Sequence, residues 1–111
     1  MVNEVGRLTG GVLEQAVDWH QAGQRVALAT VVRTWGSAPR RPGSHMAIEE
    51  SGHFVGSVSG GCVEAAVVSS ARQVMATGVP QLLEFGVTDE EAWAVGLACG
   101  GQVDIWVERV D

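Results

Sequence analysis

The residues best suited to chemistry lie in one stretch, Gly56-Ser57-Val58-Ser59-Gly60-Gly61-Cys62-Val63-Glu64. Its pattern predicts the end of a strand, a turn and the first turn of a helix. Gly60 and Gly61 carry no Cβ, so the backbone can bend sharply there and a ligand can approach it closely. With Gly61 as the N-cap, the next three amides would point out of the helix and attract an anion. Cys62 would then lie in positive potential, which favours its thiolate form.

Two familiar phosphate-binding loops do not fit this stretch. Its spacing is G-x-x-x-G-G, whereas a Rossmann turn has G-x-G-x-x-G. All seven basic residues of the chain are Arg, so it contains no Walker lysine. A purely structural interpretation stays open, because Gly-Gly often makes only a tight connection and a lone Cys is often a small buried residue.

A second candidate is the loop expected at 35–44, where two prolines flank Arg40 and Arg41 and would hold them in place. From Trp19 to Ile48 the chain contains no Asp or Glu, although its formal net charge is −6 and its pI about 4.9. A local basic stretch in an acidic protein favours binding of a particular small anion. The overall acidity argues against general binding to nucleic acid or to anionic membranes.

A third segment, Cys99-Gly100-Gly101, precedes the last expected strand and mirrors Gly60-Gly61-Cys62. We expect the Cys99 side chain either to line a second side of the site or to fill space in the core. A zinc site is not expected, because the two Cys and three scattered His show no ligand spacing. The N-terminus lacks the basic and apolar pattern of a signal peptide, so we expect reduced thiols and a cytoplasmic protein.

The elements that position these segments follow from the hydrophobic pattern. We expect a helix over 11–23, a central strand over 25–34 that is apolar on both faces, and a hairpin of His45–Glu50 and His53–Ser57. A helix over Cys62–Thr77, a strand over 81–85 and an alternating strand over 102–110 complete the chain. The inward face of the first helix is expected to carry Leu13, Ala16, Val17 and His20. That of the second helix is expected to carry Val63, Val67, Ala71, Val74 and Met75.

The 111 residues therefore predict an α/β fold in a single domain, 1–111, with a mixed sheet of about five strands and two main helices. Met46 and Ile48 are expected to face the core from the first strand of the hairpin. Glu64, as the third residue of the second helix, is expected to reach back to the N-cap amide in a capping box.

Three segments together resemble one known family: 34–43 (TWGSAPRRPG), 56–64 (GSVSGGCVE) and 96–101 (GLACGG). In this order and spacing they are similar to the N-terminal domain of the XdhC/CoxI family, and the similarity runs from about Leu13 to Glu108. Family members are molybdenum cofactor chaperones for xanthine dehydrogenase and aerobic carbon monoxide dehydrogenase. Many carry a second, Rossmann-like domain, which is not expected within these 111 residues.

The resemblance implies that the chain binds a molybdopterin-type cofactor as cargo, protects it while a terminal sulfur is installed, and delivers it to an apo-molybdoenzyme. A cofactor phosphate suits a helix N-terminus and an Arg-Arg loop, and molybdenum suits a thiolate. The residues expected to bind the cofactor are Cys62, Gly60, Gly61, Ser59, Arg40, Arg41, Cys99 and Gly100, with Cys62 also the metal ligand. The missing second domain leads us to expect a homo-oligomer or a separate Rossmann-domain chain, besides a sulfurtransferase partner.

An accessory protein is thus expected rather than an enzyme, and two alternatives remain. One is a small thiol-dependent transferase or redox enzyme with Cys62 as nucleophile. Against it, the sequence places no acid or base beside Cys62 except Glu64, which suits capping better. The other is a structural partner domain, in which the glycines serve only the fold.

Overall fold

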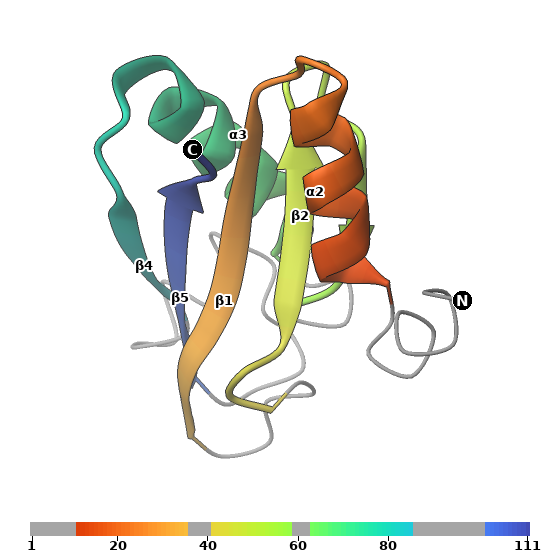
Figure 1. Ribbon diagram of the computed structural model, residues 1–111. Helices are drawn as coiled ribbons and strands as arrows, with labels where there is room; N and C mark the ends of the chain where they lie inside the picture. Colours follow the sequence, from red (N-terminus) through yellow and green to blue (C-terminus); the bar gives the residue numbers. More distant parts are fainter. Residues whose placement is uncertain (1–10, 36–40, 59–62, 86–101) are drawn as a thin grey trace.

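The computed structural model describes residues 11–35, 41–58, 63–85 and 102–111 (Figure 1). Over these ranges the chain forms α2 (Val12–Gln21), β1 (Val26–Trp35), β2 (His45–Glu49), β3 (Phe54–Gly56), α3 (Glu64–Thr77), β4 (Gln81–Phe85) and β5 (Gln102–Arg109). Each element expected over these ranges is present, with its ends close to those expected. The α/β fold with two helices and a five-stranded sheet is therefore confirmed.

The sheet has the strand order β3-β2-β1-β5-β4, so β1 is central, as its apolar pattern predicted. All four ladders are antiparallel, and the expectation of a mixed sheet is wrong in this respect. Neighbouring parallel strands require a crossover between them. Here the α3 crossover leads from β3 at one edge of the sheet to β4 at the other, so the two strands that it joins are not neighbours.

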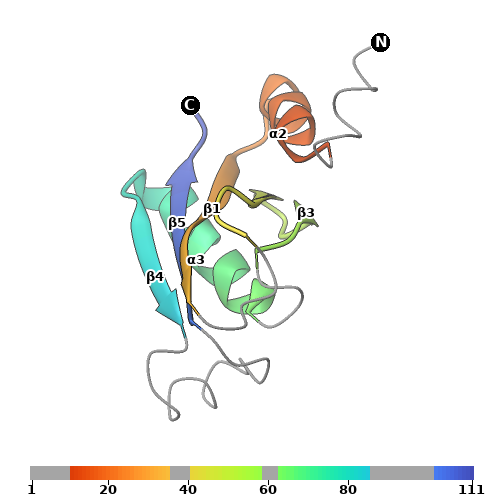
Figure 2. The same ribbon diagram turned by 90° about the horizontal axis from the view of Figure 1, so that it is seen from below.

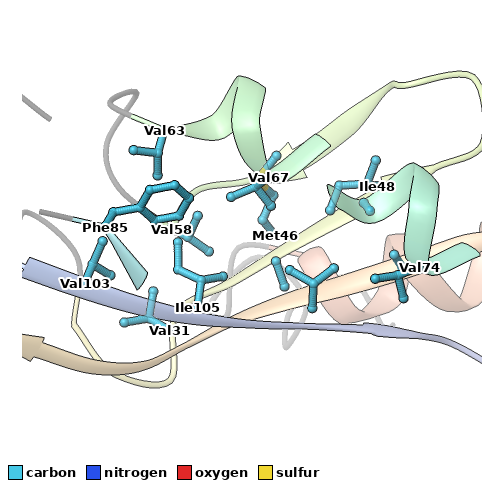
Figure 3. Packing of buried hydrophobic residues seen from close by; sticks show 14 of the residues in the cluster. Val31, Met46, Ile48, Val58, Val63, Val67, Val74, Phe85, Val103 and Ile105 are labelled. Carbon is cyan, nitrogen blue, oxygen red and sulfur yellow. The ribbon is translucent and has the colours of Figure 1, made fainter. Parts of the chain in front are cut away.

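The main core lies between α3 and one face of the sheet (Figures 2 and 3). The five residues expected on the inner face of α3 and its start are all buried, as are Met46 and Ile48 on β2. From β5, Val103, Ile105 and Val107 enter the same cluster, in the predicted alternation. This core is built mostly from Val and Ala, whose short side chains allow α3 to lie close to the strands.

The other face of the sheet is covered by α2 over β1 and β2, where Val12 and Ala16 pack against Val26 and Ala47. The expected inner face of this helix is wrong in part, because the side chains of Leu13 and Val17 are 46% and 49% exposed. His20 is exposed too. The helix is rotated so that Val12, Ala16 and the partly buried Trp19 face the sheet instead.

Candidate functional site

The described ends of the candidate segments lie at one end of the sheet, the lower end in Figure 1. β1 ends at Trp35, which pairs with Gln102 at the start of β5. At the end of β4, Phe85 pairs with Val103. Residues 36–40 and 86–101 are thus attached to the sheet at neighbouring strand ends.

The residues on either side of 59–62 lie at the same end. Val58 and Val63 are both buried and share a cluster with Phe85 and Val103 (Figure 3). The core therefore joins the chain ends that flank 59–62 to those that flank 86–101. These two segments, which are far apart in the sequence, therefore start and finish around one small group of buried side chains.

Of the eight residues expected to bind the cofactor, the structure describes Arg41. It is exposed, and it lies where the chain turns into β2. Its carbonyl oxygen accepts a 3.1 Å hydrogen bond from the Ser44 amide, while Gly43 and Ser44 bond to the backbone of Val31. Outside the described residues lie Ser59, Gly60, Gly61, Cys62, Arg40, Cys99 and Gly100, so their proposed roles stay predictions.

The start of α3 differs from the expected one. The helix begins at Glu64 with Val63 as its N-cap, whereas the sequence predicted Gly61 as the cap and Cys62 as the first helical residue. Glu64 is therefore the first residue of the helix, and the capping-box interpretation is wrong. An acidic residue at this position still interacts favourably with the helix dipole.

The side chain of Glu64 joins the start of α3 to the end of the β3 segment. Its Oε2 accepts a 2.8 Å hydrogen bond from the Ser57 hydroxyl and a 3.0 Å bond from the Val58 amide. Glu64 is buried, and its bond to the Val58 amide is shielded from water. The carboxylate thus connects the two chain ends on either side of 59–62.

Asp104 was not among the predicted site residues, although it is buried at this end of the sheet. Its side chain is 1% exposed, and Arg33 Nε approaches its Oδ2 to 3.4 Å. A shift of register between Val31 and Arg33 places Arg33 opposite Asp104 on the neighbouring strand. In the sequence Asp104 simply alternates with the apolar Val103 and Ile105, so no pattern there signals its burial.

Within the described ranges, no group of three or more His, Cys, Asp or Glu side chains is arranged to hold a metal ion. The expected ligand, Cys62, lies outside those ranges. The same part of the chain contains no helix with the length and apolar character needed to span a membrane.

Comparison with known proteins gives a consistent result. The model of the XdhC and CoxI family matches residues 19–86. The molybdenum cofactor insertion chaperone PaoD of Escherichia coli K12 is 33% identical over 100 residues, which cover 89% of this chain and 31% of PaoD. A probable xanthine dehydrogenase subunit of Bacillus subtilis 168 is 32% identical over 91 residues, which cover 78% of this chain and 27% of that protein.

A similar fold occurs in a crystal structure of a xanthine dehydrogenase from Bacillus halodurans. The TM-score is 0.73 at 29% identity, over 88% of this chain and 30% of that one. The chain thus spans less than a third of the length of each of these relatives. With the family model matching more than half of its residues, the chain belongs to the XdhC and CoxI family.

Proposed function

We propose that this chain binds the molybdenum cofactor as cargo and assists its maturation and insertion into a molybdoenzyme of the xanthine dehydrogenase or carbon monoxide dehydrogenase type. The relationship to PaoD supports this, since that protein is a molybdenum cofactor insertion chaperone and matches 89% of this chain. Because the match covers only 31% of PaoD, the proposal concerns the part of the function that resides in this domain.

One structural observation carries the proposal. The strand and helix ends that flank 36–40, 59–62 and 86–101 meet at one end of the sheet. These segments contain Arg40, Cys62 and Cys99, and Arg41 directly follows the first of them.

The chemistry of these residue types suits the cargo. Arg guanidinium groups bind phosphate oxygens through paired, charge-assisted hydrogen bonds. In our proposal the exposed Arg41, together with Arg40, holds the cofactor phosphate. Cys62 supplies a thiolate toward molybdenum, and Cys99 forms the opposite wall. Glycines at 60, 61 and 100 allow the backbone to approach the pterin.

The proposed partners follow from this role. An apo-molybdoenzyme receives the cofactor, and a sulfurtransferase supplies the terminal sulfur before delivery. We further propose that the chain works in the cytoplasm, as a homo-oligomer or beside a Rossmann-like domain.

The proposal is tested by purifying the full chain, without oxygen, from a host that makes the cofactor. Molybdenum is measured by mass spectrometry, and the pterin is measured by fluorescence after oxidation and release. We expect near-stoichiometric amounts of both in the wild-type protein. Cys62→Ser should lose most of the molybdenum and pterin, because a hydroxyl is a much weaker ligand than a thiolate.

Cys99→Ser is the matched control, because it makes the same chemical change in the other Cys. It should retain more cofactor than Cys62→Ser, and both variants should unfold at temperatures close to that of the wild type. A wild-type protein that carries neither molybdenum nor pterin would contradict the proposal. Turnover sensitive to thiol reagents in such a cofactor-free protein would instead support the enzyme alternative.

A further inference from the structure

The face of the sheet that carries α2 is covered over only part of its width. α2 packs over β2 and over the neighbouring strands β1 and β3. Among the described residues, no helix lies in front of β5 and β4 in Figure 1, although α3 packs against both strands from behind. Five large apolar side chains, each between 37% and 49% exposed, border this uncovered region, which we call the open half-face: Leu13, Val17, Val32, Leu82 and Trp106.

The three sheet residues of the open half-face lie side by side. Leu82 on β4 pairs with Trp106 on β5, which pairs with Thr30 on β1, two residues before Val32. The sequence neighbours of Leu82, Trp106 and Val32 on these strands pack in or against the core under α3. Because side chains alternate along a strand, Leu82 and Trp106 point to the opposite face. A sheet face that met only water would carry polar side chains at these positions.

The α2 helix turns one apolar side toward this row. Leu13, Val17 and His20 recur at i, i+4 and i+7, so they share one side of the helix. His20 lines a pocket together with Arg109 and Val110, at the end of β5. This side of α2 therefore faces β5, and Leu13 and Val17 form a wall beside the uncovered strands.

The open half-face has room for one further helix. Packed helices lie about 8–10 Å apart, whereas neighbouring strands lie about 4.8 Å apart. Since α2 packs chiefly over β2, a helix beside it would lie about two strands away, over β5. Such a helix would have Trp106 beneath it, Val32 and Leu82 on either side, and the wall of Leu13 and Val17 along its flank.

The charges around the open half-face are predominantly acidic. Glu84 and Glu108 are exposed, and alternation places them on the same face as Leu82 and Trp106. The exposed Arg33 side chain also lies there, where it pairs with the Asp104 carboxylate. A second copy of the chain would bring two acidic borders together, and each copy already carries a formal net charge of −6. Basic side chains on a partner would instead be attracted.

We propose that the open half-face docks an amphipathic helix of a partner protein, with apolar residues along one face and Arg or Lys along its edges. This is the helix-in-groove mode of recognition, in which the groove is formed by the α2 wall and the exposed strands. The apolar residues cover Trp106 and Leu82, and the basic residues lie near Glu84 and Glu108. The inference does not rest on the proposed function, because it uses none of the proposed cofactor-binding residues.

The test uses a fluorescein-labelled peptide of about 18 residues, rich in Ala, with Leu along one helical face and Arg along its edges. Fluorescence anisotropy measures its binding to the full chain. Two further peptides serve as probes of the same length. In one, Glu replaces every Arg, and in the other the same residues are scrambled so that the apolar face is lost. We expect the wild type to bind the basic amphipathic peptide at least about 10-fold more tightly than either of the others.

Leu82→Ser in the sheet and Leu13→Ser in the wall should each weaken binding of the basic peptide by about 10-fold, because each removes an apolar contact at the centre of the interface. Leu82→Met keeps an apolar side chain of similar volume and should bind like the wild type. Phe54→Ser is the control for surface apolarity, since Phe54 is 45% exposed but pairs with Ile48 of the core under α3, on the other face. It should leave binding unchanged, and thermal unfolding checks that every variant is folded.

Three outcomes would overturn the inference. The first is a wild type that does not bind the basic peptide, as when another part of the chain already covers the open half-face. The second is equal binding of the basic and acidic peptides, or equal losses in Leu82→Ser and Phe54→Ser. The third concerns a second copy as occupant. If analytical ultracentrifugation shows a dimer that Leu82→Ser and Leu13→Ser dissociate and Phe54→Ser does not, the open half-face is a self-association surface instead.

Discussion

The Glu64 side chain was expected to cap its helix, but in the structure it links two parts of the chain. A first-turn acid in a helix often bonds to an amide of the same turn, and this one accepts bonds from Ser57 and Val58 of the preceding segment. Both bonds end on the same oxygen of a buried carboxylate. The chain entering and leaving 59–62 is thereby held at a fixed separation, which would pre-organise a ligand site built from those residues.

Glu64→Ala should destabilise the protein by about 1–3 kcal/mol, since it leaves the buried Val58 amide without this acceptor. Glu64→Gln should cost less, because its amide oxygen can still accept a hydrogen bond. Denaturant unfolding measures both changes. If 59–62 binds the cofactor, both variants should also copurify with less molybdenum.

Glu14→Ala provides the control for Glu64→Ala, because Glu14 is the acid in the first turn of the other helix. It should change the stability much less. Equal losses for the two alanine variants would mean that Glu64 acts only through the helix dipole, and the link to the β3 segment would then have no energetic importance.

Among the elements, β3 and α2 depend on one glycine. Gly56 has φ +86°, and a Cβ built on it would overlap the carbonyl oxygen of His45 and lie 2.7 Å from Val12 Cγ2. The absence of a side chain therefore permits two contacts at once, the pairing of β3 with β2 and the packing of α2 above them. The first residue of the predicted Gly-rich stretch is thus required by the fold.

Gly56→Ala should destabilise the protein by about 3–5 kcal/mol, which combines the strain of a left-handed backbone with overpacking. Gly43→Ala is the matched control, because Gly43 has φ +91° with nothing within 4 Å of the added Cβ. It should cost only about 1–2 kcal/mol from backbone strain. Similar losses in the two variants, measured by chemical denaturation, would show that the steric contacts at Gly56 relax freely.

The sequence predicted some of these elements better than others, for physical reasons. The buried face of α3 was correct because its apolar residues recur over a long helix, which leaves one consistent stripe. In the shorter α2, Leu13 and Val17 formed an equally good stripe, and contacts with Val26 and Ala47 selected the other one.

At the site, spacing was enough to identify the segments but not the contacts that depend on tertiary structure. The pairing of Asp104 with Arg33 depends on a register shift on another strand, which no local pattern encodes. The bonds of Glu64 depend on where α3 begins, and sequence patterns locate helix ends less reliably than helix interiors. The candidate residues outside the described ranges stay predictions.

For the whole molecule, the turn between β2 and β3 couples stability to pH. Glu49 is buried and accepts hydrogen bonds from the Ser51 hydroxyl, from the Ser51 amide at 2.6 Å and from the His53 amide at 3.2 Å. The Ser51 hydroxyl bond is the largest cause that lowers the pKa of Glu49 below its ordinary value of 4.5, and burial partly opposes it.

Because the pKa of Glu49 is lower in the folded than in the unfolded protein, its ionised form stabilises the fold above pH 4.5. This contribution should be lost as the pH falls from 4.5 through the lowered folded-state pKa. Glu49→Gln should therefore unfold at a lower temperature near neutral pH, and the difference from the wild type should shrink on acidification. Thermal unfolding from about pH 7 to about pH 3 measures it.

Ser51→Ala should show a smaller version of the same pH dependence, since it removes the leading cause of the shift. Glu108→Gln, which changes an exposed acid elsewhere in the sheet, serves as the control and should follow the wild-type curve. A Glu49→Gln variant whose unfolding temperature differs from the wild type by a constant amount at every pH would contradict the linkage.

The position of β1 between β2 and β5 also has a consequence for the order of folding. Its ladder with β2 joins near neighbours in the sequence, but its ladder with β5 joins Ala27 to Arg109. A ribosome must therefore synthesise the chain through β5 before the centre of the sheet can form, and contacts between such distant residues slow folding. Until then β1 exposes one unpaired edge, which is the state in which the nascent chain is most prone to aggregate or to need a chaperone of its own.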